Sequence, residues 1–264
     1  MRQPRILPCI MIVIVFTGAL LGCSRGPSKA DQQTQQMKQQ FGELTASEAA
    51  LRSAREAVAS ARETVSTIEA IKARDRSDEQ NQQLEQAKAS MPDLESKVDS
   101  AYEDYQTRLA DFLNLALNDF PEAPETAQAL QMYATEAIYN ADDIVRKSGD
   151  YKKAIDTVQS AKGYYDAIGK EPEQMLLDKL DQLDDWRYIT KERFDQVKKK
   201  MTEQEVRDVV GVPYYMNVKK DEKRGITYWL YPKREGGAAA VYFDKKDKVY
   251  SMDFDAVKTK VAGD

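Results

Sequence analysis

Hydrophobic positions in the first half of the chain repeat every seven residues, in two separate stretches. The first stretch carries Leu44, Leu51, Val58 and Val65 at this spacing, with Ser47, Ala54, Ala61 and Ile68 three places further on. After the polar segment ARDRSDEQN, the second carries Leu84, Met91, Val98, Tyr105 and Phe112, with Ala87, Leu94 and Ala101 at the offset position. This spacing places one apolar stripe along each of two helices. Because a short polar turn joins them, we expect residues 41–118 to form an antiparallel, coiled-coil-like hairpin.

Pro92 interrupts the second stretch. A proline inside a helix removes a hydrogen bond and clashes with the preceding turn. We therefore expect a kink or a restart at this point, with Ser90 as the cap of the restarted helix. We expect the two apolar stripes to pack against each other as the hairpin's own core. The functional alternatives are that the hairpin is a coiled coil that binds a partner, or a spacer.

The segment DFPEAP at 119–124 ends the hairpin, and a second helical region follows over residues 119–185. Within it, YNADDIVRKSGDYKKAIDTVQSA at 139–161 resembles a tetratricopeptide repeat: Gly149, Asp150 and Tyr151 match the turn, and Ala154, Ile155 and Ala161 match the second helix. Asp142 stands where the repeat usually has glycine, and no second copy follows at a spacing of about 34 residues. The match predicts a helix–turn–helix, with a peptide-binding groove as the alternative.

The segment MTEQEVRDVVGVP at 201–213 has the residues of a short capped helix. Thr202 and Glu205 are spaced as a capping box, and Met201 and Val206 as a hydrophobic staple over the same end. Gly211 and Pro213 are suited to the helix exit. Since each of these residues has a structural task, the segment is interpreted as a helix with its stop, and not as a catalytic turn.

Beyond this helix the hydrophobic period changes from helix to strand. ITYWLYP (226–232), AAAVYFD (238–244) and VYSMDFD (249–255) alternate aromatic and β-branched residues, and short turn sequences separate them. An antiparallel meander is predicted. The chain as a whole is therefore expected to be α+β: a long antiparallel helical hairpin and helical bundle, followed by a small domain of two helices and an antiparallel sheet.

The C-terminal region, residues 190–264, resembles the SmpA/OmlA (BamE-like) family and the related fold of the β-lactamase-inhibitor protein. The resemblance is carried by FDQVKKKMTEQEVRDVVGVP, by the strand Trp229-Leu230-Tyr231 and by the hairpin VYFDKKDKVYSMDF. Lys200 replaces the glycine that is usual before the Met-Thr pair, and the last turn lacks the common glycine. The resemblance implies the family's fold and an envelope protein concerned with outer-membrane assembly or integrity.

Alternation along residues 226–231 assigns Trp229 and Tyr231 to one face of the sheet, and Ile226, Tyr228 and Leu230 to the other. The row of Ile226, Tyr228 and Leu230, which begins and ends with an aliphatic residue, is expected to pack under the helices. Trp229 and Tyr231, joined by Tyr214 and Tyr215 from the loop after Pro213, then form a candidate binding surface on the open face. The alternative is that the Trp229 row is itself core.

The N-terminus has the pattern of an export signal, in which the basic MRQPR precedes the apolar ILPCIMIVIVFTGALLGC. Its end, LLGC, resembles the lipobox of bacterial lipoproteins, which implies cleavage after Gly22 and acylation of Cys23. We therefore assign residues 1–22 to a signal peptide and 23–40, rich in glutamine, to a flexible tether. Ser24, in place of aspartate, favours an outer-membrane location facing the periplasm. An uncleaved anchor helix is the alternative.

Charge and composition indicate which ligands and functions are not expected. The net charge of −5 argues against nucleic acid, or an anionic membrane face, as the main ligand. The chain has no histidine, and the acids of DKLDQLDDW spread around a helix, so neither catalysis nor a metal or other cofactor is expected. The expected function is a lipid-anchored, non-catalytic scaffold that binds envelope proteins of unknown identity. The alternative is an envelope binding module that inhibits or senses an enzyme or ligand through its C-terminal sheet.

The lipobox generates the first testable prediction. Cys23→Ala should abolish incorporation of labelled palmitate and leave the precursor uncleaved, because the thiol is the acceptor of the first acyl group. Metabolic labelling and immunoblotting measure both effects. Cys9→Ala, which removes the other cysteine, is the control and should leave labelling intact. Labelling that persists in Cys23→Ala would contradict the assignment.

Overall fold

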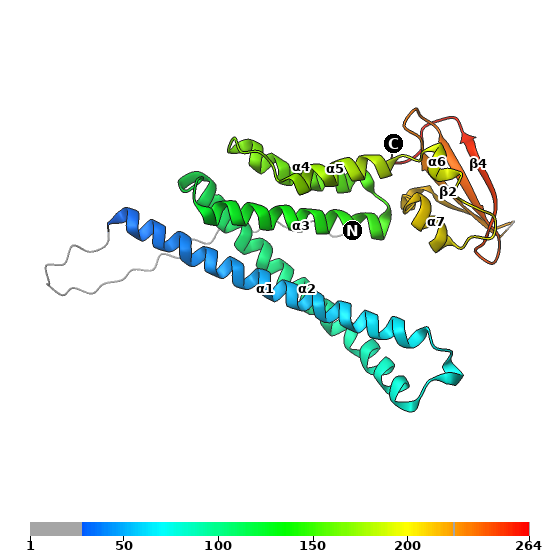
Figure 1. Cartoon of the computed structure of the whole chain (residues 1–264), viewed down its shortest axis with the longest axis horizontal. Coiled ribbons are helices and arrows are strands. Elements are labelled where there is room, and N and C mark those ends of the chain that lie inside the picture. The colour runs from blue at the N-terminus through cyan, green and yellow to red at the C-terminus, as the bar shows by residue number, and fades with distance from the viewer. Residues whose placement is uncertain (1–27, 224, 264) are drawn as a thin grey trace. The chain divides into compact units, whose positions relative to one another are not determined.

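The computed structural model describes residues 28–223 and 225–263 of the chain. These residues form seven α-helices and one four-stranded antiparallel sheet (Figure 1). The α+β fold class predicted from the change of hydrophobic period is thereby confirmed. The predicted signal peptide and Cys23 lie outside the described residues.

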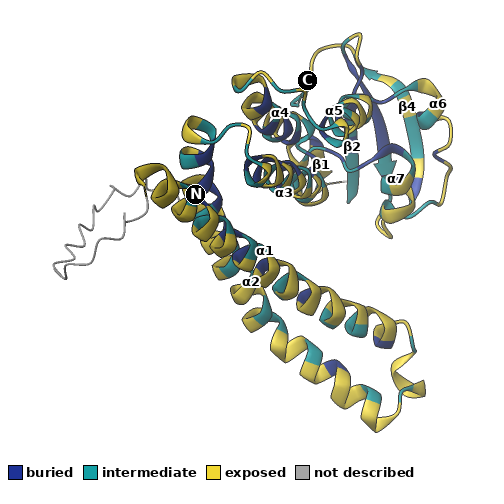
Figure 2. Ribbon diagram, turned by 60° about the vertical axis from the view of Figure 1, so that its left-hand side comes forward, coloured by how far each residue is buried: buried dark blue, intermediate teal, exposed yellow. Residues whose placement is uncertain are grey.

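Helices α1 (Lys29–Glu69) and α2 (Asp78–Asp119) form the predicted antiparallel hairpin, with the 3₁₀ turn η1 (Ala73–Asp75) between them. Three ion pairs join the two helices: Glu43–Arg108 (2.9 Å), Arg62–Glu95 (2.7 Å) and Glu69–Lys88 (2.7 Å). Residue numbers rise along α1 while those of the partners on α2 fall, which shows that the helices are antiparallel. Heptad positions of both helices are buried, as predicted: Leu44, Leu51, Val58, Ile68, Leu84, Tyr105 and Phe112. In Figure 2 the buried residues follow one side of each helix.

Two expectations about these helices are wrong. The tether expected over 23–40 is replaced by helix from Lys29 onward. Ser28 and Asp31 cap its start through hydrogen bonds between their side chains (2.7 Å) and from the Ser28 amide to Asp31 (3.0 Å), and the glutamines that follow are good helix formers. Helix α2 also continues through Pro92, which excludes a restart, one of the two alternatives expected there besides a kink. The Ser90 hydroxyl donates to the Ala87 carbonyl (3.0 Å) inside the helix and caps nothing.

Helices α3 (Pro124–Ser148), α4 (Tyr151–Ala167) and α5 (Gln174–Arg187) pack on the hairpin through one continuous apolar core. The predicted helix–turn–helix is present. Gly149 ends α3 in the left-handed conformation (φ 62°), and the Asp150 carboxylate caps α4 by accepting from the Lys153 amide (3.0 Å). Buried alanines allow α3 and α4 to approach closely: Ala134, Ala137, Ala141, Ala154 and Ala161.

The C-terminal domain contains the short helices α6 (Lys191–Phe194) and α7 (Glu203–Val210), then the 3₁₀ turn η2 (Tyr215–Asn217) and the sheet. Its strands are β1 (Val218–Asp221), β2 (Ile226–Pro232), β3 (Ala238–Phe243) and β4 (Val249–Val257), hydrogen-bonded in that order. The capping box of α7 is confirmed: the Thr202 amide donates to the Glu205 carboxylate (2.6 Å), and the Glu205 amide donates to the Thr202 hydroxyl (3.1 Å). The edge strand β1 was not predicted.

Two described residues other than glycine have a positive φ, Lys200 (74°) and Asp247 (54°). Lys200 directly precedes the Met-Thr pair, and Asp247 lies in the turn between β3 and β4. These are the two places at which the chain lacks the glycine of the SmpA/OmlA pattern. At both residues the backbone adopts a conformation that favours glycine.

The α3–α4 turn packs directly on the loop that follows α7. A Cβ atom at Gly149 would lie 2.3 Å from the Pro213 carbonyl oxygen and 2.8 Å from the Tyr214 nitrogen. Further contacts join the helices to the sheet domain: for example, the Ile189 amide donates to the Pro232 carbonyl (2.9 Å), and Arg234 pairs with Asp184 (2.7 Å). The glycine is therefore required at this joint for its φ and for its lack of a side chain.

This joint gives the second prediction. Gly149→Ala should lower the free energy of unfolding by at least about 1–2 kcal/mol, since alanine is strained at positive φ and its methyl group would collide with Pro213. Gly163→Ala, inside α4 with open space around it, is the control and should raise stability by up to about 1 kcal/mol. Urea denaturation measures both. Equal effects of the two substitutions would contradict the close contact at Gly149.

Candidate functional site

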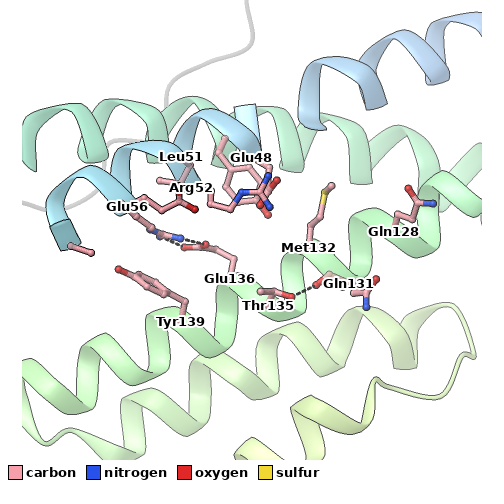
Figure 3. Close-up of a pocket in the computed structure, with 13 residues that line it drawn as sticks. Glu48, Leu51, Arg52, Glu56, Gln128, Gln131, Met132, Thr135, Glu136 and Tyr139 are labelled. Carbon is pink, nitrogen blue, oxygen red and sulfur yellow. Dashed lines mark hydrogen bonds and ion pairs between the residues drawn. The ribbon is translucent and has the colours of Figure 1, made fainter. Parts of the chain in front are cut away.

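Facing stripes of α1 and α3 form the walls of an open groove of about 810 Å³ (Figure 3). The two stripes have the same spacing and each spans three helical turns, and α2 contributes Tyr105 between them. The α1 wall comprises Glu48, Leu51, Arg52, Arg55, Glu56 and Ala59, and the α3 wall comprises Gln128, Gln131, Met132, Thr135, Glu136 and Tyr139. Each wall combines apolar residues with polar ones, which is typical of a surface that binds another protein segment.

An ion pair between Arg55 and Glu136 joins the two walls. The guanidinium donates through both terminal nitrogens to the carboxylate, with Nη1–Oε2 at 2.8 Å and Nη2–Oε1 at 2.7 Å. The same guanidinium lies 3.7 Å from the centre of the Tyr139 ring, close enough for a cation–π contact. In Figure 3 Glu136 and Tyr139 stand near each other on α3. A planar, bidentate arrangement fixes both helices relative to each other more tightly than a single contact would.

The ion pair is largely shielded from water, because the side chains of Arg55 and Glu136 are 21% and 8% exposed. Burial by itself disfavours the charged guanidinium, but the hydrogen bonds and the charge of Glu136 outweigh it and hold the pKa of Arg55 above its ordinary value. Burial also raises the pKa of the Tyr105 phenol in the groove. Both shifts favour the protonated forms, the charged guanidinium of Arg55 and the neutral phenol of Tyr105.

A second open groove, of about 550 Å³, lies on the other side of Arg55. It separates the hairpin from the C-terminal half of α3 and is lined by apolar residues such as Val58 and Val98 and by charged ones such as Arg62 and Asp143. Tyr102 at its side accepts a hydrogen bond from Asn140 (3.0 Å). Arg55 and Tyr139 line both grooves, so they divide one recess of the helical body into two.

The structure contradicts the expected exposure of Trp229 and Tyr231. Trp229 is 1% exposed, with its ring 4.5 Å from that of Phe243, and Tyr231 is 5% exposed and donates to the Gly211 carbonyl (3.2 Å). Both belong to the core under α6 and α7, together with residues such as Val206. The largest side chains of the strand fill the space beneath the helices, since that placement buries the most apolar surface. The alternative stated from the sequence is the correct one.

Tyr214 and Tyr215 lie on the loop after Pro213 as expected, with their rings 4.9 Å apart, but only Tyr215 is largely exposed, at 59%. The buried Trp229 row does not join them in a surface. The open face of the sheet carries another set of tyrosines. The ring centres of Tyr228 and Tyr242 are 5.8 Å apart, and those of Tyr242 and Tyr250 are 6.1 Å apart. The alternation of β2 and β3 contained this signal, because Tyr228 on β2 lies opposite Tyr242 on β3.

The acids of DKLDQLDDW make individual surface contacts. Asp184 accepts from Arg234 (2.7 Å), and Asp178 accepts from Gln174 on its own helix (2.8 Å). Within residues 28–223 and 225–263, no three acidic, histidine or cysteine side chains come together as metal ligands. In the same part of the chain, no helix is long and apolar enough to cross a membrane.

The third prediction tests the ion pair. Arg55→Leu should lower the free energy of unfolding by about 3 kcal/mol, because Glu136 would stay buried without its partner, and Arg55→Leu/Glu136→Leu should recover most of this loss. Arg62→Leu, which breaks the exposed pair with Glu95, is the control and should change stability by less than about 1 kcal/mol. If Arg55→Leu cost no more than Arg62→Leu, the pair would not be the bridge described.

No protein-family model, curated protein or solved structure matches the chain. The resemblance of its C-terminal region to the SmpA/OmlA family therefore stays a prediction, carried by the residues quoted for it.

Proposed function

We propose that the chain is a lipid-anchored, non-catalytic scaffold of the cell envelope that holds a helical segment of a partner protein in the groove between α1 and α3. The observation that carries this proposal is the pair of equally spaced helical walls, joined at Arg55 and Glu136. A third helix laid between two such walls would complete a compact helical bundle.

The size and chemistry of the groove favour a helix as the ligand. Each wall spans twelve residues from its first to its last side chain, and the eleven steps between them correspond to roughly 16 Å along a helix. Leu51 and Tyr105 are buried beneath the groove and Met132 is half-buried at its surface, and exposed polar residues such as Arg52 and Gln128 stand beside them. An amphipathic helix of about three turns matches this arrangement, with its apolar side inward and its polar edges along the rims.

The anchor and the location rest on the sequence. The LLGC motif supports acylation of Cys23, and several acyl chains would hold the protein stably at a membrane. Ser24 after the cysteine supports the outer membrane, facing the periplasm. The SmpA/OmlA-like C-terminal domain supports a role in the assembly or integrity of that membrane, and the positive φ values at Lys200 and Asp247 agree with the family's glycine positions.

A non-catalytic role agrees with the chemistry of the groove. Its ionised centre, Arg55 with Glu136, is occupied by mutual hydrogen bonds. The chain contains no histidine to act as a general base near neutral pH. The groove therefore offers shape and fixed charge, which suit binding.

One observation favours the second candidate function, a binding module that acts through the C-terminal sheet. Tyr228, Tyr242 and Tyr250 form a row across three strands on the face opposite α6 and α7. Tyr250 is exposed, and Tyr228 and Tyr242 are half-buried. Tyrosines combine a large apolar ring with a hydroxyl and are frequent in binding hot spots. This face would then contact the enzyme or ligand that the module inhibits or senses.

Filling the groove tests the proposal. Ala59→Trp/Thr135→Trp should abolish capture of the partner by chemical cross-linking in cells, because two indoles would occupy the space of the bound helix. Ser53→Trp/Ala127→Trp, at exposed positions of the same two helices outside the groove, is the matched control. Mass spectrometry identifies the captured protein, and melting curves verify that both variants remain folded.

The proposal requires loss of capture in the groove variant alone. Capture that survives there but is lost in Tyr228→Ala/Tyr242→Ala would favour the second candidate and exclude the groove as the binding site.

A further inference from the structure

Lysines gather at one end of the C-terminal sheet. They stand on three separate segments: the loop between α6 and α7, the β1–β2 hairpin and the β3–β4 hairpin. We call the following nine residues the basic end: Lys198, Lys199, Lys200, Lys219, Lys220, Lys223, Lys245, Lys246 and Lys248. All are exposed except Lys248, which is half-buried.

Contacts between the three segments show that they lie together. A Cβ atom at Gly225, in the first hairpin, would lie 2.8 Å from Cε of Lys245 in the second. The Lys200 amide donates to the Val249 carbonyl (2.7 Å), and Thr202 forms a β-bridge with Lys248. The antiparallel order β1-β2-β3-β4 explains this, since alternate turns of a meander emerge at the same end of the sheet.

The charge of the basic end is not neutralised by ion pairs. None of the nine ammonium groups pairs with a carboxylate of any residue that the structure describes. Asp244, in the same turn as three of them, is occupied with the backbone, where it accepts from the amides of Lys246 (2.8 Å) and Lys248 (3.1 Å). The same three segments also carry the carboxylates of Asp195, Asp221, Glu222, Asp244 and Asp247. Nine positive charges are thus opposed by five negative ones, and this end of the sheet keeps a net positive charge that faces solvent.

The sign of this field is opposite to that of the helical body. Residues 29–188 contain 19 basic and 31 acidic side chains, whereas residues 189–264 contain 17 basic and 13 acidic ones. The net charge of the whole chain thus conceals two regions of opposite sign. A ligand of the basic end is expected to be anionic.

We propose that the basic end binds the surface of an anionic phospholipid bilayer. Lysine is a compact, strongly hydrated charge on a flexible stem, which suits a diffuse layer of phosphates better than the fixed geometry of a protein carboxylate. None of the nine lysines lines either groove of the helical body, so the basic end is a surface separate from both. Each lysine that lies close to an anionic membrane strengthens the binding of the protein to that membrane severalfold.

This contact goes beyond the proposed function and is independent of it. It uses no residue of the α1–α3 groove and needs no lipid on Cys23. Failure of one proposal would leave the other unaffected.

Vesicle sedimentation tests the proposal on the chain from Ser24 onward, which lacks the acylated cysteine and keeps every described residue. Vesicles of phosphatidylcholine alone are compared with equal mixtures of phosphatidylcholine and either phosphatidylglycerol or phosphatidylserine, at low and at high salt. The variant Lys219→Gln/Lys220→Gln/Lys245→Gln/Lys246→Gln is compared with Lys72→Gln/Lys97→Gln/Lys152→Gln/Lys153→Gln. The control removes the same number of exposed charges from the helical body.

We expect binding to both anionic mixtures, little to phosphatidylcholine, and weakening by added salt. The basic-end variant should bind on the order of a hundredfold more weakly, and the control should bind like the unmodified chain. Absence of binding to anionic vesicles at low salt would overturn the proposal, as would equal losses in the two variants. Binding to polyglutamate without binding to vesicles would assign the basic end to an acidic protein partner and would also overturn it.

Discussion

The bidentate ion pair between Arg55 and Glu136 is the contact on which the shape of the candidate site depends. It joins the α1–α2 hairpin to α3 at a point where both side chains are mostly removed from water. The core of the helical body holds these elements together through apolar contacts that have no direction. The ion pair adds direction, because a planar guanidinium and a planar carboxylate meet in one geometry only. The groove walls are therefore held in register by a polar contact inside an apolar assembly.

The helical hairpin and the capped helix α7 could be predicted because their signals are local. A heptad repeat reports the face of a helix wherever the helix lies, and the Thr202–Glu205 cap needs residues three positions apart. The prediction of a flexible tether over residues 23–40 was wrong for a related reason. Its glutamine-rich composition resembled a linker, although glutamine is also a good helix former, and the cap at Ser28 and Asp31 decided between the two.

The groove and the faces of the sheet could not be predicted, since both depend on residues distant in sequence. Arg55 and Glu136 are 81 positions apart, and each has the sequence context of an ordinary charge on a helix surface. On β2 both alternating rows contain aromatic residues, so alternation defined the rows correctly without showing which one is core. That choice depends on the space under α6 and α7, which Trp229 and Tyr231 fill. A row ending in tyrosine is apolar enough to be buried once its hydroxyl has an acceptor, here the Gly211 carbonyl.

Lys200 shows how stability and surface charge can oppose each other at one residue. Its backbone occupies the left-handed region, where a side chain costs roughly 1–2 kcal/mol relative to glycine. The same side chain belongs to the basic end. Lys200→Gly would relax the backbone and remove one positive charge. A search for stabilising substitutions would therefore select a change that weakens the electrostatic field of the basic end. A design that aims at a more stable protein should therefore treat this position as a functional one.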